Sequence, residues 1–316
     1  MKVPGPSRQV ASLPGPHILP GSSPHPVRAA SPGGPPGRDG LRCGVGVGKG
    51  ECGSRLVQPE AKMDNLQIAN VLVEEGTRLF ESPRGLVPFT RDEQVDSFMN
   101  DIVRYPHAFV FGCILDRQVK AELAWEAPYQ LAQRIGGFEV RMLEALSGDD
   151  FYRLMTRPDP LHRFPKEMSQ NLYQAVLLIK TIYASDAARI WSGTPSSATI
   201  VYRLLQFRGV GLKIATMAAN VLARDLKVQF SDYFSIDIST DVHVRRVFTR
   251  LGLIKKGASN EELIYLARSM SPKFPGLLDL PTFNIGRQWC KPSQPLCSEC
   301  YMSGLCATAQ GALVGA

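Results

Sequence analysis

The chain has 316 residues, of which 44% are hydrophobic and 21% charged, and its formal net charge is +7. This composition indicates a globular protein with enough length for one large domain or two smaller ones. It argues against a membrane protein, since no run approaches about eighteen apolar residues, and the first residues lack the apolar stretch of a signal peptide.

The positive charge is unevenly distributed. Residues 1–62 hold eight Lys/Arg and three Asp/Glu, whereas the remaining residues hold 28 Lys/Arg and 26 Asp/Glu. A positive charge invites a nucleic-acid partner, but a nearly balanced main body requires any basic surface for DNA to be local.

Residues 1–62 contain eleven Pro and twelve Gly without a triplet repeat. Such a segment buries too little apolar surface to offset its ordering entropy, so we expect a disordered tail. A helical pattern opens at Met63 and continues to Leu72. Met63 is therefore a candidate for the true start, with an over-extended reading frame before it. A flexible arm that tethers DNA and a transit peptide are the other interpretations.

The segment after the tail predicts helices in succession. Residues 63–104 indicate one or two helices, interrupted near residues 82–85, and the next helix follows Tyr105-Pro106 and continues into the stretch 114–118. Further helical patterns cover residues 128–135, 140–146 and 168–182, separated by Gly, Pro and Asp. No pattern indicates a hairpin of strands, so the sequence predicts an all-α protein.

The run Phe207-Arg208-Gly209-Val210-Gly211-Leu212-Lys213-Ile214-Ala215 predicts a helix, a glycine hairpin and a second helix. Glycine permits the sharp turn and a close approach to the backbone. Amides of such a hairpin and of the second helix's first turn point outward and attract an anion such as a DNA phosphate. An ordinary pair of antiparallel helices is the alternative. Lys213, in that first turn, and Asp241, in the later run Asp241-Val242-His243-Val244-Arg245-Arg246-Val247, favour a functional interpretation.

Four of the seven cysteines have the spacing C-x6-C-x2-C-x5-C, namely Cys290, Cys297, Cys300 and Cys306. Zinc sites usually pair their thiolates in two short knuckles, whereas here only the middle pair is close. Four thiolates within seventeen residues suit one [4Fe–4S] cluster, although neither common ferredoxin spacing is matched. Structural zinc and disulfides are the alternatives. A cluster would indicate a reducing, intracellular location.

Together, G-V-G-x-K-x-A, D-V-H-V-x-R-V and the cysteine spacing resemble the helix-hairpin-helix DNA glycosylases, in their endonuclease III branch. The resemblance spans about residues 63–308. It implies that Lys213 is a nucleophile, that Asp241 lies at the mouth of the same pocket and that the four cysteines bind a [4Fe–4S] cluster. Gln118 matches the glutamine of the family's L-S-x-Q segment, which fills the gap left by an extruded base. Residues 119–121 replace the T-D that follows in the family, and a surface helical glutamine is the alternative.

The resemblance also implies an all-α, two-lobed fold with a groove for bent duplex DNA. Residues 63–104 would form N-terminal helices that pack with the cluster lobe, residues 105–251 a helical barrel with the helix-hairpin-helix at about 197–224, and residues 252–316 the C-terminal cluster lobe. One nucleotide would be flipped into the pocket between Lys213 and Asp241.

The implied function is base-excision repair. The enzyme would cleave the N-glycosidic bond of a damaged or mismatched base in double-stranded DNA and nick the abasic site by β-elimination through a lysine Schiff base. The expected DNA contacts are Gln118, Arg208, Gly209, Gly211 and Lys291. We expect a monomer associated with DNA, in the nucleoid or the nucleus. The sequence does not reveal the target base.

Three other functions remain open at this point. A monofunctional adenine-mismatch glycosylase shares the resemblance, but it normally lacks a lysine at position 213 and carries a further C-terminal domain. A non-enzymatic DNA-binding iron–sulfur protein would fit Arg208, where relatives have proline, and the long insert before Asp241, with Lys213 as a mere phosphate contact. A redox protein is the third. The connection before Asp241 is about ten residues longer than is usual in the family, so Asp232 and Asp237 are rival carboxylates.

Overall fold

The computed structural model describes residues 60–311. The expected disordered tail, residues 1–62, lies outside this range except for its last three residues, which begin the first helix. All regular elements within residues 60–311 are helices, which confirms the predicted all-α class. In this range, no helix combines the length and apolar character that crossing a membrane would need.

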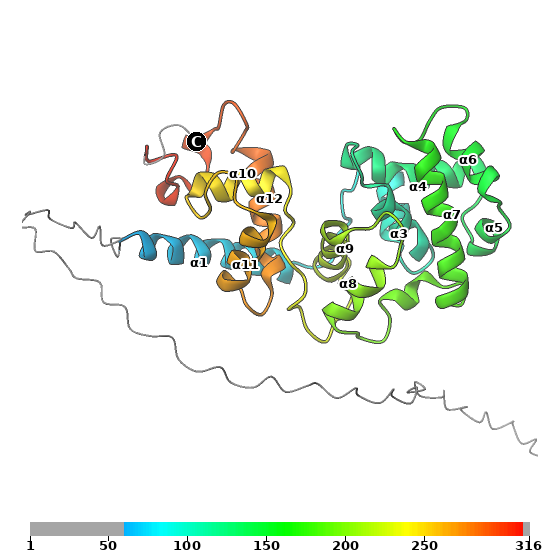
Figure 1. Cartoon of the computed structure of the whole chain (residues 1–316), viewed down its shortest axis with the longest axis horizontal. Coiled ribbons are helices and arrows are strands. Elements are labelled where there is room, and N and C mark those ends of the chain that lie inside the picture. The colour runs from blue at the N-terminus through cyan, green and yellow to red at the C-terminus, as the bar shows by residue number, and fades with distance from the viewer. Residues whose placement is uncertain (1–59, 312–316) are drawn as a thin grey trace, which may run out of the picture. The chain divides into compact units, whose positions relative to one another are not determined.

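Two separate hydrophobic cores divide residues 60–311 into two lobes. The large lobe contains the elements α2 (Glu93–Asn100), α3 (Pro106–Leu115), α4 (Ala121–Ile135), α5 (Val140–Glu144), α6 (Gly148–Thr156), α7 (Pro165–Ile182), η1 (Ala187–Ile190), α8 (Ser197–Leu205) and α9 (Leu212–Arg224). In Figure 1 it extends from cyan to yellow-green.

Helix α3 is the centre of the large lobe. Its sequence, PHAFVFGCIL, is apolar on every side, and all ten residues are buried, as expected for a helix surrounded by others. Gly112 allows α4 to approach closely, because a Cβ at this position would lie 2.4 Å from the Trp125 ring. The C-terminal end of this rigid, buried helix therefore has a fixed position.

The small lobe combines the start of the described chain with its end. It contains α1 (Glu60–Glu81), α10 (Val242–Leu251), α11 (Asn260–Met270), η2 (Pro275–Leu278), α12 (Asp279–Gln288), η3 (Cys297–Glu299) and η4 (Ser303–Leu305). Ile68 and Leu72 of α1 share its core with Phe248 of α10 and Ile285 of α12. The N-terminal helix thus closes the lobe that carries the cysteines.

The lobes divide the chain differently from the expected domains. Helix α10 belongs to the small lobe, because its apolar face, including Val247 and Phe248, packs in the second core. The expected barrel of residues 105–251 therefore ends before α10. Helix α2, expected to pack with the cluster lobe, contributes Val95 and Met99 to the core of the large lobe. The amphipathic pattern predicted these helices but not the core each would join.

Helices α8 and α9 flank the glycine hairpin. The Ser196 side chain caps α8 by accepting a hydrogen bond from the amide of Thr199. Phe207 and Val210 are buried between the two helices, and the amide of Val210 donates to the carbonyl of Phe207 at 3.0 Å. Gly209 has φ +93°, a conformation that favours glycine, whereas Gly211, the N-cap of α9, has φ −95°.

Candidate functional site

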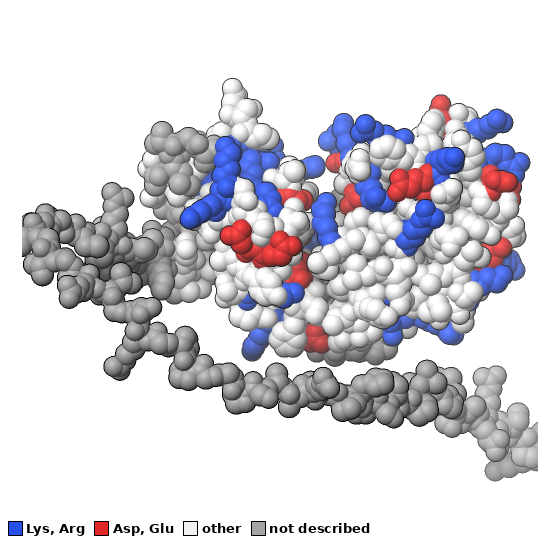
Figure 2. Space-filling model, viewed as in Figure 1, with Lys and Arg blue, Asp and Glu red and all other residues white. Residues whose placement is uncertain are grey.

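A groove of about 1370 Å³ is lined by residues of both lobes. Its walls include the end of α3, the start of α4, one face of α9, the start of α10 and one face of α12. Lys213 and Asp241 both line it. Figure 2 shows that Lys and Arg side chains lie on both sides of the central hollow, with acidic side chains among them.

Lys213 is the second residue of α9 and is exposed. The cap of α9, Gly211, makes no side-chain hydrogen bond to the helix, so the first amides of α9 are not used by a cap. The lysine amine and these amides therefore belong to the same helix end, which also carries the positive pole of the helix dipole.

Asp241 is the N-cap of α10 and is half-buried. Its Oδ1 accepts hydrogen bonds from the amides of His243 and Val244, both at 2.8 Å. These two bonds fix the orientation of the carboxylate at the groove. Lys213 and Asp241, which come from different lobes, are thus brought to one cavity.

The two rival carboxylates have structural partners. Asp237 is buried and forms a two-pronged ion pair with Arg268, at 2.7 and 2.9 Å. Asp232 accepts hydrogen bonds from the hydroxyl and the amide of Ser197, at the start of α8. Neither aspartate lines the groove.

Two further carboxyl groups of the groove were not identified from the sequence. Asp116 is the C-cap of α3. Burial raises its pKa; the Lys213 charge counteracts this shift, and the Asp241 charge adds to it. A signal was present, because Asp116 lies two residues before Gln118 in a segment that the resemblance had already singled out.

Asp279 is the other unexpected carboxyl, at the first position of α12. Its Oδ1 accepts a hydrogen bond from the amide of Ser239 at 2.7 Å. Burial raises the pKa of Asp279 to about 6, while the nearby guanidinium of Arg224 opposes the shift. We find no sequence signal for this residue.

The groove is mixed in charge rather than basic. Its lining includes six Lys or Arg residues and seven Asp or Glu residues. Arg287 pairs with Glu122 at 3.4 Å, and Arg224 pairs with its neighbour Asp225 at 2.7 Å. Any basic surface that contacts DNA in the groove must therefore be a local patch, as the nearly balanced charge of the main body of the chain predicted.

The expected DNA contacts lie in three places. We expected α3 to continue to Gln118. The helix instead ends at Leu115, and Gln118 lies in the loop that follows, with φ +56°. It is exposed and does not belong to the groove lining. Arg208, at the glycine hairpin, is exposed and lines a separate pocket of about 590 Å³ beside α6 and α7. Lys291 is exposed in the cysteine loop.

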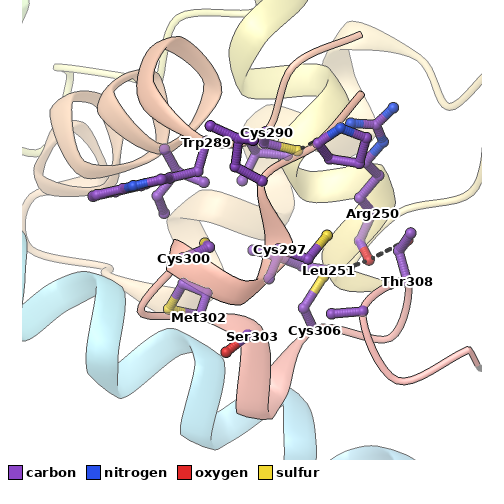
Figure 3. A pocket seen from close by; sticks show the side chains of 15 residues that line it. Arg250, Leu251, Trp289, Cys290, Cys297, Cys300, Met302, Ser303, Cys306 and Thr308 are labelled. Carbon is purple, nitrogen blue, oxygen red and sulfur yellow. Dashed lines mark hydrogen bonds between the residues drawn. The ribbon is translucent and has the colours of Figure 1, made fainter. Parts of the chain in front are cut away.

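The four C-terminal cysteines line one cavity together with apolar residues of the small lobe (Figure 3). None of them forms a disulfide. Arg250 of α10 holds this loop: its Nη1 donates to the Sγ of Cys290 at 3.4 Å and to the carbonyl of Lys291 at 2.6 Å. The Sγ of Cys306 in turn donates to the carbonyl of Arg250 at 3.3 Å. No sequence pattern indicated Arg250 for this role.

Arg246 makes a second connection between α10 and the cysteine loop. Its Nε donates to the carbonyl of Cys290 at 2.7 Å, and its Nη2 lies 2.9 Å from the carbonyl of Gly286 and 3.0 Å from Nδ1 of His243. Helix α10 therefore carries Asp241 at its start and holds the cysteine loop along its length.

The donor set consists of four thiols, the ligands that a [4Fe–4S] cluster requires. The four thiols line a shared cavity. In a cubane cluster each thiolate binds a different iron, so the ligands are spread around the group. The chemistry and placement of the four thiols agree with this arrangement.

Two relatives match the chain in sequence, and no family model matches it. Endonuclease III of Thermotoga maritima is 29% identical over 103 residues, which cover 33% of this chain and 44% of that protein. Endonuclease III-like protein 1 of Gallus gallus is 29% identical over 219 residues, which cover 66% of each chain. The matched region thus spans less than half of the first relative and about two thirds of the second.

Solved structures show the same fold. A trapped covalent endonuclease III–DNA intermediate matches with a TM-score of 0.54 and 17% identity, over 78% of this chain and 98% of the other. A thermostable thymine-DNA glycosylase matches with a TM-score of 0.52 and 13% identity, over 79% and 99% of the two chains. The all-α, two-lobed arrangement is therefore shared with these proteins.

Proposed function

We propose that the chain is a base-excision repair glycosylase with AP lyase activity, of the helix-hairpin-helix DNA glycosylase superfamily in its endonuclease III-like branch, as the similarity to two endonuclease III proteins supports. The observation that carries the proposal is the presence of Lys213 and Asp241 in one groove. The rival carboxylates Asp232 and Asp237 are engaged elsewhere, which supports Asp241 as the catalytic carboxylate.

Duplex DNA is the proposed partner. The uncapped first turn of α9 and the backbone of Gly209 offer amides to a phosphate. Arg208, Gln118 and Lys291 are exposed and add contacts from the hairpin, the loop after α3 and the cysteine loop. The protein would act as a monomer, inside the cell and in association with DNA.

The chemistry starts with a nucleotide flipped into the groove. Cleavage of the N-glycosidic bond develops positive charge at C1′ of the sugar, and the fixed carboxylate of Asp241 stabilises that charge. The deprotonated amine of Lys213 attacks C1′ and forms a Schiff base, which acidifies the 2′-proton and permits loss of the 3′ phosphate by β-elimination. Lys213 favours this bifunctional route over a monofunctional adenine-mismatch glycosylase.

A [4Fe–4S] cluster is the proposed cofactor, held by Cys290, Cys297, Cys300 and Cys306. When bound, it would cross-link the loop of residues 290–306 through iron–thiolate bonds. Arg250 and Arg246 tie the same loop to α10 by hydrogen bonds. The proposed role of this site is to hold the DNA-facing residues of the small lobe, including Lys291, in place.

The test is a panel of duplexes, each with one damaged or mismatched base, incubated with the protein and examined for base release and strand cleavage. Borohydride added during turnover should reduce the Schiff base and trap a covalent protein–DNA adduct. Lys213→Gln should abolish the adduct while binding to undamaged duplex stays nearly unchanged. An adduct at full yield from this variant would contradict the role of Lys213, and base release without any adduct would indicate the monofunctional reaction.

A further inference from the structure

Three carboxyl groups interact electrostatically with Lys213 or with one another in the groove. They belong to Asp116, Asp241 and Asp279, and all four residues line the same cavity. If all were ionised, three negative charges would share this part of the groove with the ammonium group of Lys213 and with Arg224, which acts on Asp279. Carboxylates that share a site raise one another's pKa values, so one of them can take up and release a proton during the reaction.

The three carboxyls differ in how they are held. Oδ1 of Asp241 accepts two amide hydrogen bonds of α10, and Oδ1 of Asp279 accepts the amide of Ser239. Within residues 60–311, the carboxyl of Asp116 forms neither a hydrogen bond nor an ion pair within 4 Å. It is half-buried at the end of α3, on the wall contributed by the large lobe. Asp116 is thus the carboxyl that is free to exchange a proton.

The surroundings of Asp116 couple it to the amine. Among the charged groups, Lys213 of α9 has the largest electrostatic effect on the pKa of Asp116, and Asp241 at the start of α10 has the second largest. The neighbouring Arg117 is engaged by Glu167 of α7 at 3.0 Å. The other titratable groups nearby are the buried thiol of Cys113 on α3, the buried imidazole of His162, which interacts with the backbone of Leu115 and Arg117, and, at the start of α4, Lys120 and Glu122.

We infer that Asp116 is a further catalytic residue of this groove, which takes a proton from the Lys213 ammonium group and delivers it to the leaving group. This inference rests on the proposed function. It gives Asp241 and Asp116 different tasks, since Asp241 stabilises charge at C1′ and Asp116 moves the proton.

On a base-bearing nucleotide, the Lys213 ammonium gives one proton to the Asp116 carboxylate, and the amine lone pair forms the N–C1′ bond. The C1′–base bond breaks with its electron pair on the base, which takes the proton from Asp116 and leaves neutral. At an abasic site, the amine adds to the C1′ aldehyde, and the aldehyde oxygen takes a second proton from the nitrogen and becomes a hydroxyl. Asp116 then gives its proton to this hydroxyl, which leaves as water and leaves the Schiff base behind. Asp116 ends each sequence as a carboxylate.

The experiment uses a duplex with a single abasic site, so that the target base need not be known. Under single-turnover conditions with borohydride, the rate of adduct formation is measured from about pH 5 to pH 9. The wild-type rate should rise with pH through the pKa of Asp116, which burial raises above its ordinary value, because only the carboxylate can accept the lysine proton.

Asp116→Asn should lower the maximal rate of adduct formation by about a hundredfold, the magnitude expected for loss of a general acid–base. It should also remove the rise of this rate with pH on the acidic side of the pH–rate profile, called here the acid limb. Asp116→Glu should restore the limb. Asp159→Asn is the charge-matched control, since Asp159 is exposed and is not part of the groove lining. It should leave rate and profile unchanged.

The possible outcomes separate the two proposals. An unchanged rate and profile in Asp116→Asn, beside an active wild type, would overturn the role of Asp116 alone. Equal losses in Asp116→Asn and Asp116→Glu, with the acid limb intact and duplex affinity reduced, would also overturn it, since they indicate a structural residue. No wild-type adduct on the abasic duplex and no base release from any damaged duplex would overturn the proposed function, and this inference with it.

Discussion

Gly209 lies directly against Asn171: a Cβ at Gly209 would be 2.7 Å from Nδ2 of the Asn171 carboxamide. Asn171 belongs to α7 and is only 1% exposed. Neither atom of its carboxamide has a hydrogen-bond partner among residues 60–311. Gly209 of the glycine hairpin therefore packs against a buried side chain that cannot move aside into solvent.

This contact predicts that the two hairpin glycines differ. Gly209→Ala should weaken binding to undamaged duplex at least tenfold and destabilise the fold by about 2 kcal/mol, because φ +93° strains an L-residue and Asn171 blocks the methyl group. Gly211→Ala should have a clearly smaller effect, since φ is −95° and no atom lies within 4 Å of its Cβ. Fluorescence anisotropy with a labelled duplex and thermal melting measure both variants, and equal losses would contradict the distinction.

Asp241→Asn should lower base release by about a hundredfold while the fold stays intact. Asparagine can still accept the amides of His243 and Val244, so the cap survives, but the charge that stabilises C1′ is lost. Asp237→Asn is the comparison. It disrupts the ion pair with Arg268 and should reduce the free energy of unfolding by about 1 to 3 kcal/mol with little effect on chemistry. Single-turnover kinetics and thermal melting measure both variants. A loss of base release in Asp237→Asn, with a loss of stability alone in Asp241→Asn, would show that Asp241 is misassigned.

Asp279→Asn should stabilise the protein at neutral pH. A carboxyl whose folded-state pKa is about 6, against about 4 in the unfolded chain, binds its proton more tightly when folded. The free energy of unfolding therefore falls as the pH rises from about 4 to about 6 and stays lower above that range. Asparagine does not ionise, so the variant avoids this decrease in the free energy of unfolding, which is at most about 3 kcal/mol. Its side chain can also keep the hydrogen bond from the amide of Ser239. Melting temperatures from pH 4 to pH 8 should diverge with rising pH, and a constant difference would contradict the titration.

The protein purified without oxygen should be brown, absorb broadly near about 400 nm and contain about four irons per chain, as thiolate-ligated iron–sulfur clusters do. Cys300→Ser should lower the iron content and the duplex affinity together, because the loop of residues 290–306 loses one of its four attachments. Cys113→Ser is the comparison, since Cys113 is buried within α3, away from this loop, and should leave the iron content unchanged. Stoichiometric zinc without iron would contradict the cofactor assignment.

Local sequence patterns determined the helices and the two specific motifs. The all-apolar stretch of α3 predicts a buried helix, and glycines at 209 and 211 predict a turn, because both follow from the chemistry of neighbouring residues. The C-x6-C-x2-C-x5-C spacing is equally local, since one short loop supplies all four thiols. These features need no knowledge of how distant segments meet.

Contacts between distant segments decided the rest, and spacing along the chain cannot reveal them. Arg268 of α11 engages Asp237, which lies in the connection between α9 and α10, and this removes that carboxylate from the candidates. Asp116 and Asp279 reach Lys213 and Asp241 only because the ends of α3 and α12 form facing walls of one groove. Asn171 distinguishes Gly209 from Gly211, although both glycines look equivalent in the sequence. Each of these effects depends on desolvation, charge or steric contact across the fold, and these quantities exist only once the lobes have packed.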